Sequence, residues 1–235
     1  ESELKKPTFQ VAIGSNYFFE ISKLRALRIL WKTLATEYGM STDCHIIASP
    51  SKRNKTLYAY NTNMIRTTIE SMAAVLGGAD TVFNLPYDSI YHKDNAFGNR
   101  IALNQLLLLK EESYFKEITK ATNGAYYIET ITHQLADKAL QLFKTIEKGG
   151  GFLHQLKNHT IQKKVKESAQ KEQTLFDVKE SILVGTNKFE DHSTRMKSDI
   201  ELYPFIKTKT RKTLLEPLLE KRLAEGTEQQ RLATE

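Results

Sequence analysis

The sequence predicts an α/β fold built around a small parallel sheet. Short apolar runs alternate with longer segments of helical periodicity over the first 110 residues or so, which is the pattern of successive βα units. A complete eight-stranded barrel needs about 250 residues, and the second half of this 235-residue chain is mostly helical in pattern. A full barrel is therefore excluded. An open α/β domain and a part of a barrel whose other strands lie elsewhere both remain possible.

The first βα unit covers residues 8–39. T-F-Q-V-A-I (8–13) is a short apolar run that suits a buried strand. Ser15 or Asn16 then offers a side-chain oxygen to cap a helix. Apolar residues recur at helical spacing after this cap, and Gly39 supplies a stop.

Two more units follow the same pattern. C-H-I-I-A (44–48) predicts the second strand, and the helical periodicity from residue 63 to residue 76 ends at Gly77-Gly78. D-T-V-F-N-L (80–85) predicts a third strand, and residues 100–112 predict a helix that is buried on more than one side.

The rest of the chain predicts mostly helices. Residues 126–129 look β-prone, Thr132 is the expected cap of the next helix, and Gly149-Gly150-Gly151 is its expected end. A polar helix over 155–173 and a last strand over 181–184 follow. The tail predicts an amphipathic C-terminal helix whose apolar anchors are Leu214, Leu215, Leu218, Leu219 and Leu223.

The composition excludes several classes of protein. Hydrophobic residues make up 40% and charged residues 26%, so the chain can bury a core. The single cysteine, Cys44, excludes an intramolecular disulfide and a cysteine-rich metal site. No apolar run reaches the length of a membrane span, no signal peptide is visible, and the first residue is Glu1. We expect a cytoplasmic protein that is processed or is an excerpt of a longer one.

The net charge of +6 leaves a basic nucleic-acid-binding module open as a remote alternative. The positive and negative residues are interleaved along the chain, which does not favour it. Residues 52–55, K-R-N-K, form a basic loop that either attracts phosphates or is simply solvated.

Other local signals are weak. The six histidines, His45 among them, show no metal-ligand spacing, so no metal site is expected. Gly14-Ser15-Asn16 offers backbone N–H groups to an anion, although an ordinary βα turn explains it better. The pair Glu111-Glu112 fits helix solubility better than acid/base chemistry. Local chemistry alone predicts no enzyme.

Longer strings carry a resemblance that covers the chain from about Thr8 to Phe189. In their order and spacing they closely resemble the methylmalonyl-CoA mutase family. The strings are I-G-S-N-Y-F-F-E-I-S-K-L-R-A-L-R-I-L-W (13–31), N-M-I-R-T-T-I-E-S-M-A-A-V-L-G-G-A-D (63–80), R-I-A-L-N-Q-L-L-L-L-K-E-E-S (100–113), G-A-Y-Y-I-E (124–129) and I-L-V-G-T-N-K-F (182–189).

The resemblance implies a fold and a reaction. Members of the family have an acyl-CoA-binding (β/α)₈ TIM barrel coupled to an adenosylcobalamin domain, and they convert (R)-methylmalonyl-CoA to succinyl-CoA by a radical rearrangement. This chain resembles the second half of the barrel, about its last four βα units, over residues 1–130. Residues 131–235 then form a helical extension. The family's G-Y-H-M-Q-E segment and the cobalamin signature D-x-H-x-x-G are absent from this sequence.

The resemblance also implies that the site has decayed. Active members carry H-x-Q-T-S-G and G-G-T-Q-S-L-H-T-N-x-x-D-E-A where this chain has H-I-I-A-S-P-S-K and G-G-A-D-T-V-F-N-L-P-Y-D-S-I. The family's His falls on Ile47, so His45 is not its equivalent. A leucine in place of an amide has neither donor nor acceptor, and a serine in place of a glutamate is shorter. The replaced cofactor-facing positions are Ser49, Lys52, Asp80, Leu85 and Ser89.

The scaffold strings are kept while these positions differ, which indicates the small, non-catalytic subunit of the heterodimeric mutase. We expect no cofactor on this chain and adenosylcobalamin in the partner large subunit. The expected partners are that large subunit and the missing half of the barrel or a second copy. The alternative is a subunit that retains weak acyl-CoA binding or a related acyl-CoA mutase activity, because the CoA-facing Arg and Ser of active members fall near Lys6 and Thr8, which are polar as well.

Overall fold

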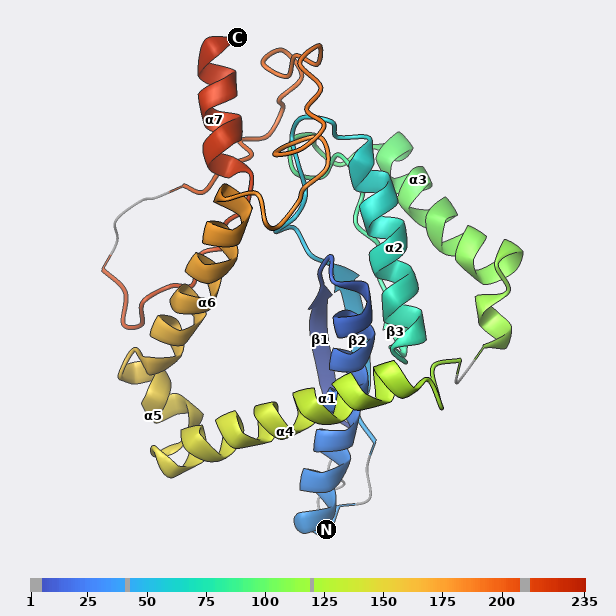
Figure 1. Ribbon diagram of the computed structural model, residues 1–235, viewed down its shortest axis with the longest axis vertical. Coiled ribbons are helices and arrows are strands. Elements are labelled where there is room, and N and C mark those ends of the chain that lie inside the picture. Colours follow the sequence, from blue (N-terminus) through green and yellow to red (C-terminus); the bar gives the residue numbers. More distant parts are fainter. Residues whose placement is uncertain (1–5, 41–42, 119–120, 208–211) are drawn as a thin grey trace. The chain divides into compact units, whose positions relative to one another are not determined.

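The computed structural model describes residues 6–40, 43–118, 121–207 and 212–235. The chain divides into two compact units (Figure 1). Unit 1 consists of residues 1–51, 64–86 and 95–141, and unit 2 consists of residues 52–63, 87–94 and 142–235. Each unit has apolar clusters of its own, so each is held together by side chains from distant parts of the sequence.

Unit 1 contains a parallel sheet of three strands. They are β1 (Thr8–Ile13), β2 (His45–Pro50) and β3 (Thr81–Val82), in the order β1-β2-β3. Thr8 pairs with His45 and Ile13 with Pro50, and the parallel β2–β3 pairing includes Ile47 with Thr81. The predicted α/β class with a parallel sheet is confirmed. The third strand is shorter than the predicted 80–85, because its pairing with β2 involves only two residues.

Helix α1 (Tyr17–Glu37) begins and ends where the sequence predicts. The side chain of Asn16 accepts a hydrogen bond from the backbone N–H of Phe19 at 3.4 Å, which satisfies one of the unpaired donors of the first turn. Gly39 has a φ of +67° and lets the chain leave the helix. The local signals at Asn16 and Gly39 therefore suffice to define this helix.

Helix α2 (Thr62–Leu76) joins β2 to β3 and is also confirmed. It ends at Gly77-Gly78, where Gly78 has a φ of +82°. Gly77 allows close packing, because a Cβ at this position would lie only 2.9 Å from Cδ1 of Leu24 on α1.

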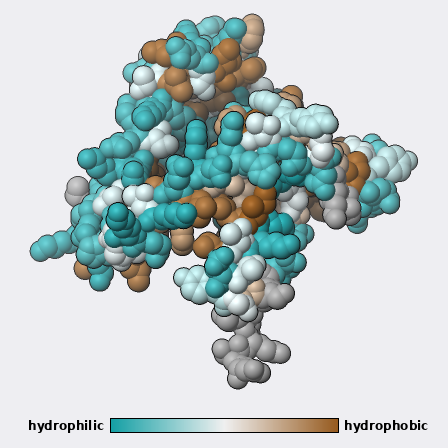
Figure 2. Space-filling model, turned by 60° about the horizontal axis from the view of Figure 1, so that its bottom comes forward, coloured by the Kyte–Doolittle hydropathy of each residue, from teal (hydrophilic) through white to brown (hydrophobic). Residues whose placement is uncertain are grey.

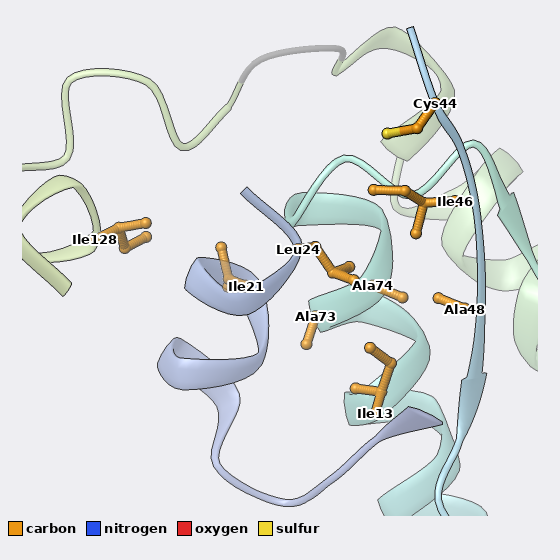
Figure 3. Close-up of a cluster of buried hydrophobic side chains, with 9 residues drawn as sticks. All are labelled: Ile13, Ile21, Leu24, Cys44, Ile46, Ala48, Ala73, Ala74 and Ile128. Atoms are coloured by element: carbon orange, nitrogen blue, oxygen red, sulfur yellow. The ribbon is translucent and has the colours of Figure 1, made fainter. Parts of the chain in front are cut away.

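The main apolar cluster of unit 1 lies between the sheet and these two helices. Figure 3 shows the side chains of Ile46 and Ala48 from β2 facing Leu24 of α1 and Ala74 of α2. Ile128 reaches the cluster from the helix α4 (Tyr126–Lys148). Burial of these groups removes apolar surface from water at roughly 25 cal/mol per Å² and so fixes both helices against the sheet.

The remaining described elements of unit 1 are α3, two short turns and the first part of α4. Helix α3 (Ala96–Leu107) is capped by Asn95, whose side chain accepts from the N–H of Gly98 at 2.7 Å, so it begins earlier than the predicted residue 100. Its last turn, η1 (Leu108–Glu112), has π-helical hydrogen bonding, and a short 3₁₀ turn, η2 (Phe115–Glu117), follows.

The prediction for the start of α4 is wrong. Residues 126–129 are its first turn and not a β-prone piece, and Thr132 lies inside it. The Thr132 hydroxyl donates to the carbonyl of Ile128 at 2.7 Å, a bond that is available only within a helix. The exposed aromatic residues at its start raise the apparent β-propensity, but the burial of Ile128 and Ile131 on one face decides for the helix.

The described residues of unit 2 from 142 onward contain the end of α4 and three further helices. Gly150 and Gly151 have positive φ and separate α4 from α5 (Gly151–Lys157), as the sequence predicts. The predicted helix over 155–173 is in fact two helices, because His159 has a φ of +60° between α5 and α6 (Thr160–Asp177). The last is α7 (Glu225–Thr234).

The predicted strand over 181–184 is wrong. This segment forms a turn, in which the N–H of Gly185 donates to the carbonyl of Lys188 at 2.8 Å. Asn187 folds back on the turn, accepting from the N–H of Leu183 and donating to the carbonyl of Ser181. These side-chain bonds stabilise the turn, and the only strand-like pairing described for this segment is a single bridge between Val184 and Lys188.

The predicted C-terminal helix over 214–223 is also wrong. Residues 212–222 form no helix, and α7 begins only at Glu225. Pro217 lies in the middle of the leucine-rich segment, lacks a backbone N–H and disfavours helical conformation in the residue before it. Leu214, Leu218 and Leu219 are exposed rather than anchored.

Candidate functional site

In a parallel sheet flanked by helices, chemistry belongs at the carboxyl ends of the strands. The pairing of Ile13 with Pro50 brings the ends of β1 and β2 to the same edge, where the N–H of Ser51 donates to the carbonyl of Ile13 at 2.7 Å. The residues after β3, beginning with Phe83, leave at this edge as well. The side chains around this edge therefore decide what unit 1 can bind.

The turn after β1 does not offer a vacant anion site. Asn16 already caps α1, and a Cβ on Gly14 would lie 3.3 Å from Oε1 of Glu20, so the Glu20 carboxylate lies against this turn. Glu20 also pairs with Lys23, whose ammonium donates to the carbonyl of Ala12 at 2.7 Å. A carboxylate in the first turn already supplies the negative charge that a helix N-terminus favours. An ordinary βα turn, the better explanation from the sequence, fits these contacts.

The end of β3 carries a buried amide network. Asn84 donates to the carbonyl of Ala102 at 2.9 Å and to Oε1 of Gln105 at 2.8 Å, and it accepts from the N–H of Leu85 at 2.9 Å. Gln105 in turn donates to the hydroxyl of Thr68 at 2.7 Å. Both amides are buried, so these bonds join β3, α2 and α3 and leave the two amides engaged with the chain itself.

Of the five replaced positions, Ser49 and Leu85 lie near this edge. Ser49 is half-buried next to the last residue of β2, and Leu85 is half-buried beside Asn84. Lys52 and Ser89 belong to unit 2. Lys52 is exposed, whereas Ser89 is half-buried with a buried hydroxyl that lacks a hydrogen-bond partner.

Asp80 lies at the other end of the sheet. It comes directly before β3, accepts from the N–H of Ile46 at 2.8 Å and pairs with Arg28 at 2.9 Å. Burial raises the pKa of its carboxyl, but the hydrogen bonds from Ile46 and Arg28 outweigh burial and hold the pKa below its usual value. The family motif groups Asp80 with Ser49 and Leu85 as a cofactor-facing position, and the structure separates it from both.

The two candidate CoA-contacting residues also lie at the amino ends of the strands. Lys6 precedes β1 and Thr8 begins it, and both are exposed. His45 begins β2 next to Thr8 in the sheet, and its Nε2 lies 3.0 Å from the hydroxyl of Thr81. Lys6 and Thr8 are thus accessible on one edge, whereas no catalytic geometry around His45 is evident from these contacts.

The basic loop 52–55 is neither a phosphate loop nor a solvated one. Lys55 and Asn54 are buried, with the Lys55 ammonium donating to Oδ1 of Asn54 at 2.7 Å. Arg53 pairs with Glu172 of α6. Only Lys52 is exposed in this loop, so most of its positive groups are not presented to a nucleic acid.

Unit 2 contains a buried ion pair that the sequence analysis missed. Nη1 of Arg222 lies 2.7 Å from Oε2 of Glu228, and the two side chains are only 5% and 2% exposed. Glu225 is also buried and accepts from the N–H of Arg222 at 2.9 Å. Burial raises the pKa of Glu228 against the opposing effect of Arg222. A sequence signal for this ion pair is R-L-A-E-G-T-E (222–228), in which a charged residue recurs every three positions at the start of a helix.

A pocket of about 280 Å³ adjoins this ion pair in unit 2, lined in part by Tyr58, Asp177, Thr186 and Arg231. Its polar groups are largely used by the chain. The Tyr58 hydroxyl donates to Glu235 at 2.6 Å, Arg231 donates to two backbone carbonyls, and Asp177 accepts from a glutamine of the same helix. The hydroxyl of Thr186 and Oε2 of Glu228, which also line the pocket, are buried without a hydrogen-bond partner among the described residues, apart from the ion pair of Glu228.

Some other site classes find no support in the parts of the chain that the structure describes. No group of three or more His, Cys, Asp or Glu side chains there is arranged to hold a metal ion. No helix within the same residues is long and apolar enough to cross a membrane. Glu111 is exposed and pairs with Lys116 at 2.6 Å, which fits a surface role. Figure 2 shows a face that is mostly hydrophilic, with hydrophobic side chains gathered in smaller patches.

Comparison with known proteins agrees with the resemblance. The family model described as methylmalonyl-CoA mutase matches residues 3–233. The methylmalonyl-CoA mutase small subunit of Porphyromonas gingivalis is 39% identical over 186 residues, which are 77% of this chain and 30% of that protein. The large subunit of the same organism is 30% identical over 186 residues, 77% of this chain and 26% of that protein.

A third relative is the methylmalonyl-CoA mutase of Cereibacter sphaeroides, which is 32% identical over 190 residues, 77% of this chain and 26% of that protein. The chain therefore spans about three tenths of the length of the relatives that it matches. The family that the sequence strings indicate is confirmed, as is the likeness to a small subunit.

Proposed function

The chain belongs to the methylmalonyl-CoA mutase family, and on this premise we propose that it is part of a small, non-catalytic subunit. The observation that carries the proposal is the chemistry at the strand ends. Leu85 offers no polar side-chain group, Ser49 is short, and the nearby amide of Asn84 is engaged with Ala102, Gln105 and Leu85. These residues do not fit a corrinoid or its ribose, so we assign no catalytic step to them.

In this proposal residues 1–130 are the second half of a (β/α)₈ barrel and residues 131–235 are its helical extension. The parallel order β1-β2-β3, with α1 and α2 as the connections, supports this assignment. In the described residues β1 and β3 each pair on one side only. Unpaired strand edges attract other strands. The rest of the barrel, from a separate segment or a second copy, would supply them.

The proposed partner is a large catalytic subunit, which carries adenosylcobalamin and isomerises (R)-methylmalonyl-CoA to succinyl-CoA. Two relatives support this proposal, because a small and a large subunit of one organism both match the chain, and the small subunit matches better, at 39% against 30% identity. The chain itself would serve assembly and stability, in the cytoplasm.

Two measurements test this proposal. Adenosylcobalamin is titrated into the chain and followed by absorbance, with a catalytic large subunit as the positive control. We expect no saturable change, and tight stoichiometric binding would refute the non-catalytic role. Co-purification with the large subunit is expected, and its failure under conditions in which both proteins are folded would refute the assembly role.

A second candidate function is retained acyl-CoA binding. Lys6 and Thr8 favour it, because both are exposed polar residues on the same edge of the sheet. Isothermal titration with succinyl-CoA, comparing the chain with its Lys6→Ala variant, decides between the two. Saturable heat that is lost in the variant supports this candidate, and the absence of heat refutes it.

A further inference from the structure

The loop that follows β2 is bound along its backbone by the C-terminal segment of the same unit. The N–H of Leu223 donates to the carbonyl of Arg53 at 2.9 Å, and Arg222 donates to the carbonyl of Lys55 at 3.0 Å. The N–H of Leu57 donates to Oε1 of Glu228 at 2.7 Å. Backbone groups of Arg53, Lys55 and Leu57 are thus hydrogen-bonded to residues about 170 positions later in the chain.

Side chains extend these contacts to the next residue of the loop. The Tyr58 hydroxyl donates to Oε1 of Glu235 at 2.6 Å, and the guanidinium of Arg231 lies 3.8 Å from the centre of the Tyr58 ring. Glu235 also accepts from the N–H groups of Met196 and Lys197, both at 3.0 Å. The cation–π contact and the shared carboxylate fix the far end of the segment.

The charged side chains of the C-terminal segment are buried, which shows how closely this segment packs against the loop. Taken as whole residues, with backbone and side chain together, Arg222, Glu225 and Glu228 are each no more than 4% exposed. A buried charge is tolerated only when it is paired and hydrogen-bonded, and removal of one partner leaves the other uncompensated. The contact therefore has a defined geometry, unlike a tail that rests on the surface.

A second contact within unit 2 restrains the loop at Ala59. Ala59 has a φ of +50°, which is uncommon for a residue with a side chain. A Cβ on Gly185 would lie 2.5 Å from the Cβ of Ala59, so only glycine allows this approach. The turn at 183–187 and the C-terminal segment together leave the loop little freedom.

We propose that Arg222–Glu235 is an intramolecular lock on the loop Arg53–Tyr58, which keeps its backbone groups from any ligand. This inference rests on the proposed function and deepens it. The resemblance places the family's cofactor segment H-x-Q-T-S-G directly before this loop, its last residue falling on Lys52. The chain then lacks cofactor binding for two reasons: its polar side chains are replaced, and the adjoining loop is occupied by its own segment.

Amide hydrogen exchange tests the lock without any cofactor. The intact chain is compared with Glu228→Ala, which removes the acceptor for Leu57 and the partner of Arg222. We expect exchange in a peptide covering 53–58 to rise at least tenfold, while a peptide from α2, 66–76 in unit 1, is unchanged. Glu220→Ala, at an exposed position two residues before this segment, is the matched control and should leave both peptides as they are.

A milder variant covers the case in which Glu228→Ala unfolds. Tyr58→Phe removes only the hydroxyl bond to Glu235 and keeps the ring under Arg231, so we expect about a fivefold rise confined to residues 53–58. No rise in this peptide in either variant, or an equal rise in the α2 peptide, would refute the lock. The cobalamin titration fails or succeeds independently of these rates, so failure of the lock and failure of the proposed function are distinguishable.

Discussion

Replacement of Asn84 by alanine tests whether the strand-end network of unit 1 is structural. The side chain makes two donor bonds, to Ala102 and Gln105, and accepts from the N–H of Leu85. Alanine leaves Oε1 of Gln105 and the N–H of Leu85 without these partners. An orphaned buried polar group costs about 1–3 kcal/mol. Because Leu85 is only half-buried, we expect a loss of about 3 kcal/mol in the free energy of unfolding.

The assay is urea denaturation followed by tryptophan fluorescence. Trp31 is the single tryptophan of the chain and packs against Phe9 in unit 1, so its signal reports this unit. With a denaturant slope of about 2 kcal/mol per M, the expected loss lowers the midpoint by about 1.5 M. The control is Asn104→Ala, at an exposed position of α3, which should change the free energy by less than about 0.5 kcal/mol.

The comparison of Asn84→Ala with Asn104→Ala decides whether the Asn84 network is structural. If the two variants unfold at the same midpoint, the Asn84 amide does not hold the strand end. It would then be available to a ligand, and the polar groups at the strand ends would not be fully used by the chain itself.

Two further predictions concern packing and pH. Gly185→Ala should lower the melting temperature followed by circular dichroism, with a loss of about 2 kcal/mol, because of its φ of +81° and the approach to Ala59; Gly226→Ala, which meets nothing within 4 Å, should not lower it. Because the pKa of Asp80 is lowered in the folded chain, its bond to Arg28 should stabilise unit 1 above about pH 4 and be lost as the pH falls. Asp80→Asn should therefore flatten the pH dependence of the urea midpoint below pH 4, and an unchanged slope would contradict this assignment.

The first half of the fold follows from local signals. Asn16 and Gly39 define α1 because a cap and a left-handed glycine act over one helical turn. The same reasoning fails at the start of α4, where the packing of Ile128 into the unit 1 cluster overrides the β-propensity of the aromatic residues before it. It fails again in the tail, where apolar spacing indicates a helix that Pro217 prevents.

The candidate site was only partly predictable for a related reason. Alignment to a motif gives the position of Asp80 along the chain. Its placement at the amino ends of the strands depends on the register of β3 against β2. The bond between Glu228 and Leu57 joins residues 171 positions apart, and no local pattern indicates such a pair. The sequence shows that R-L-A-E-G-T-E is charged, but the partner that buries those charges is set by the tertiary fold.

The strand ends of unit 1 and the loop after β2 have one property in common. Buried donors and acceptors each cost free energy if they are left unpaired. In unit 1 the amides of Asn84 and Gln105 bond to each other and to the neighbouring helices. In unit 2 the backbone of the loop bonds to Arg222 and Glu228. In both places the chain satisfies its own buried polar groups, which is what the proposed non-catalytic framework requires.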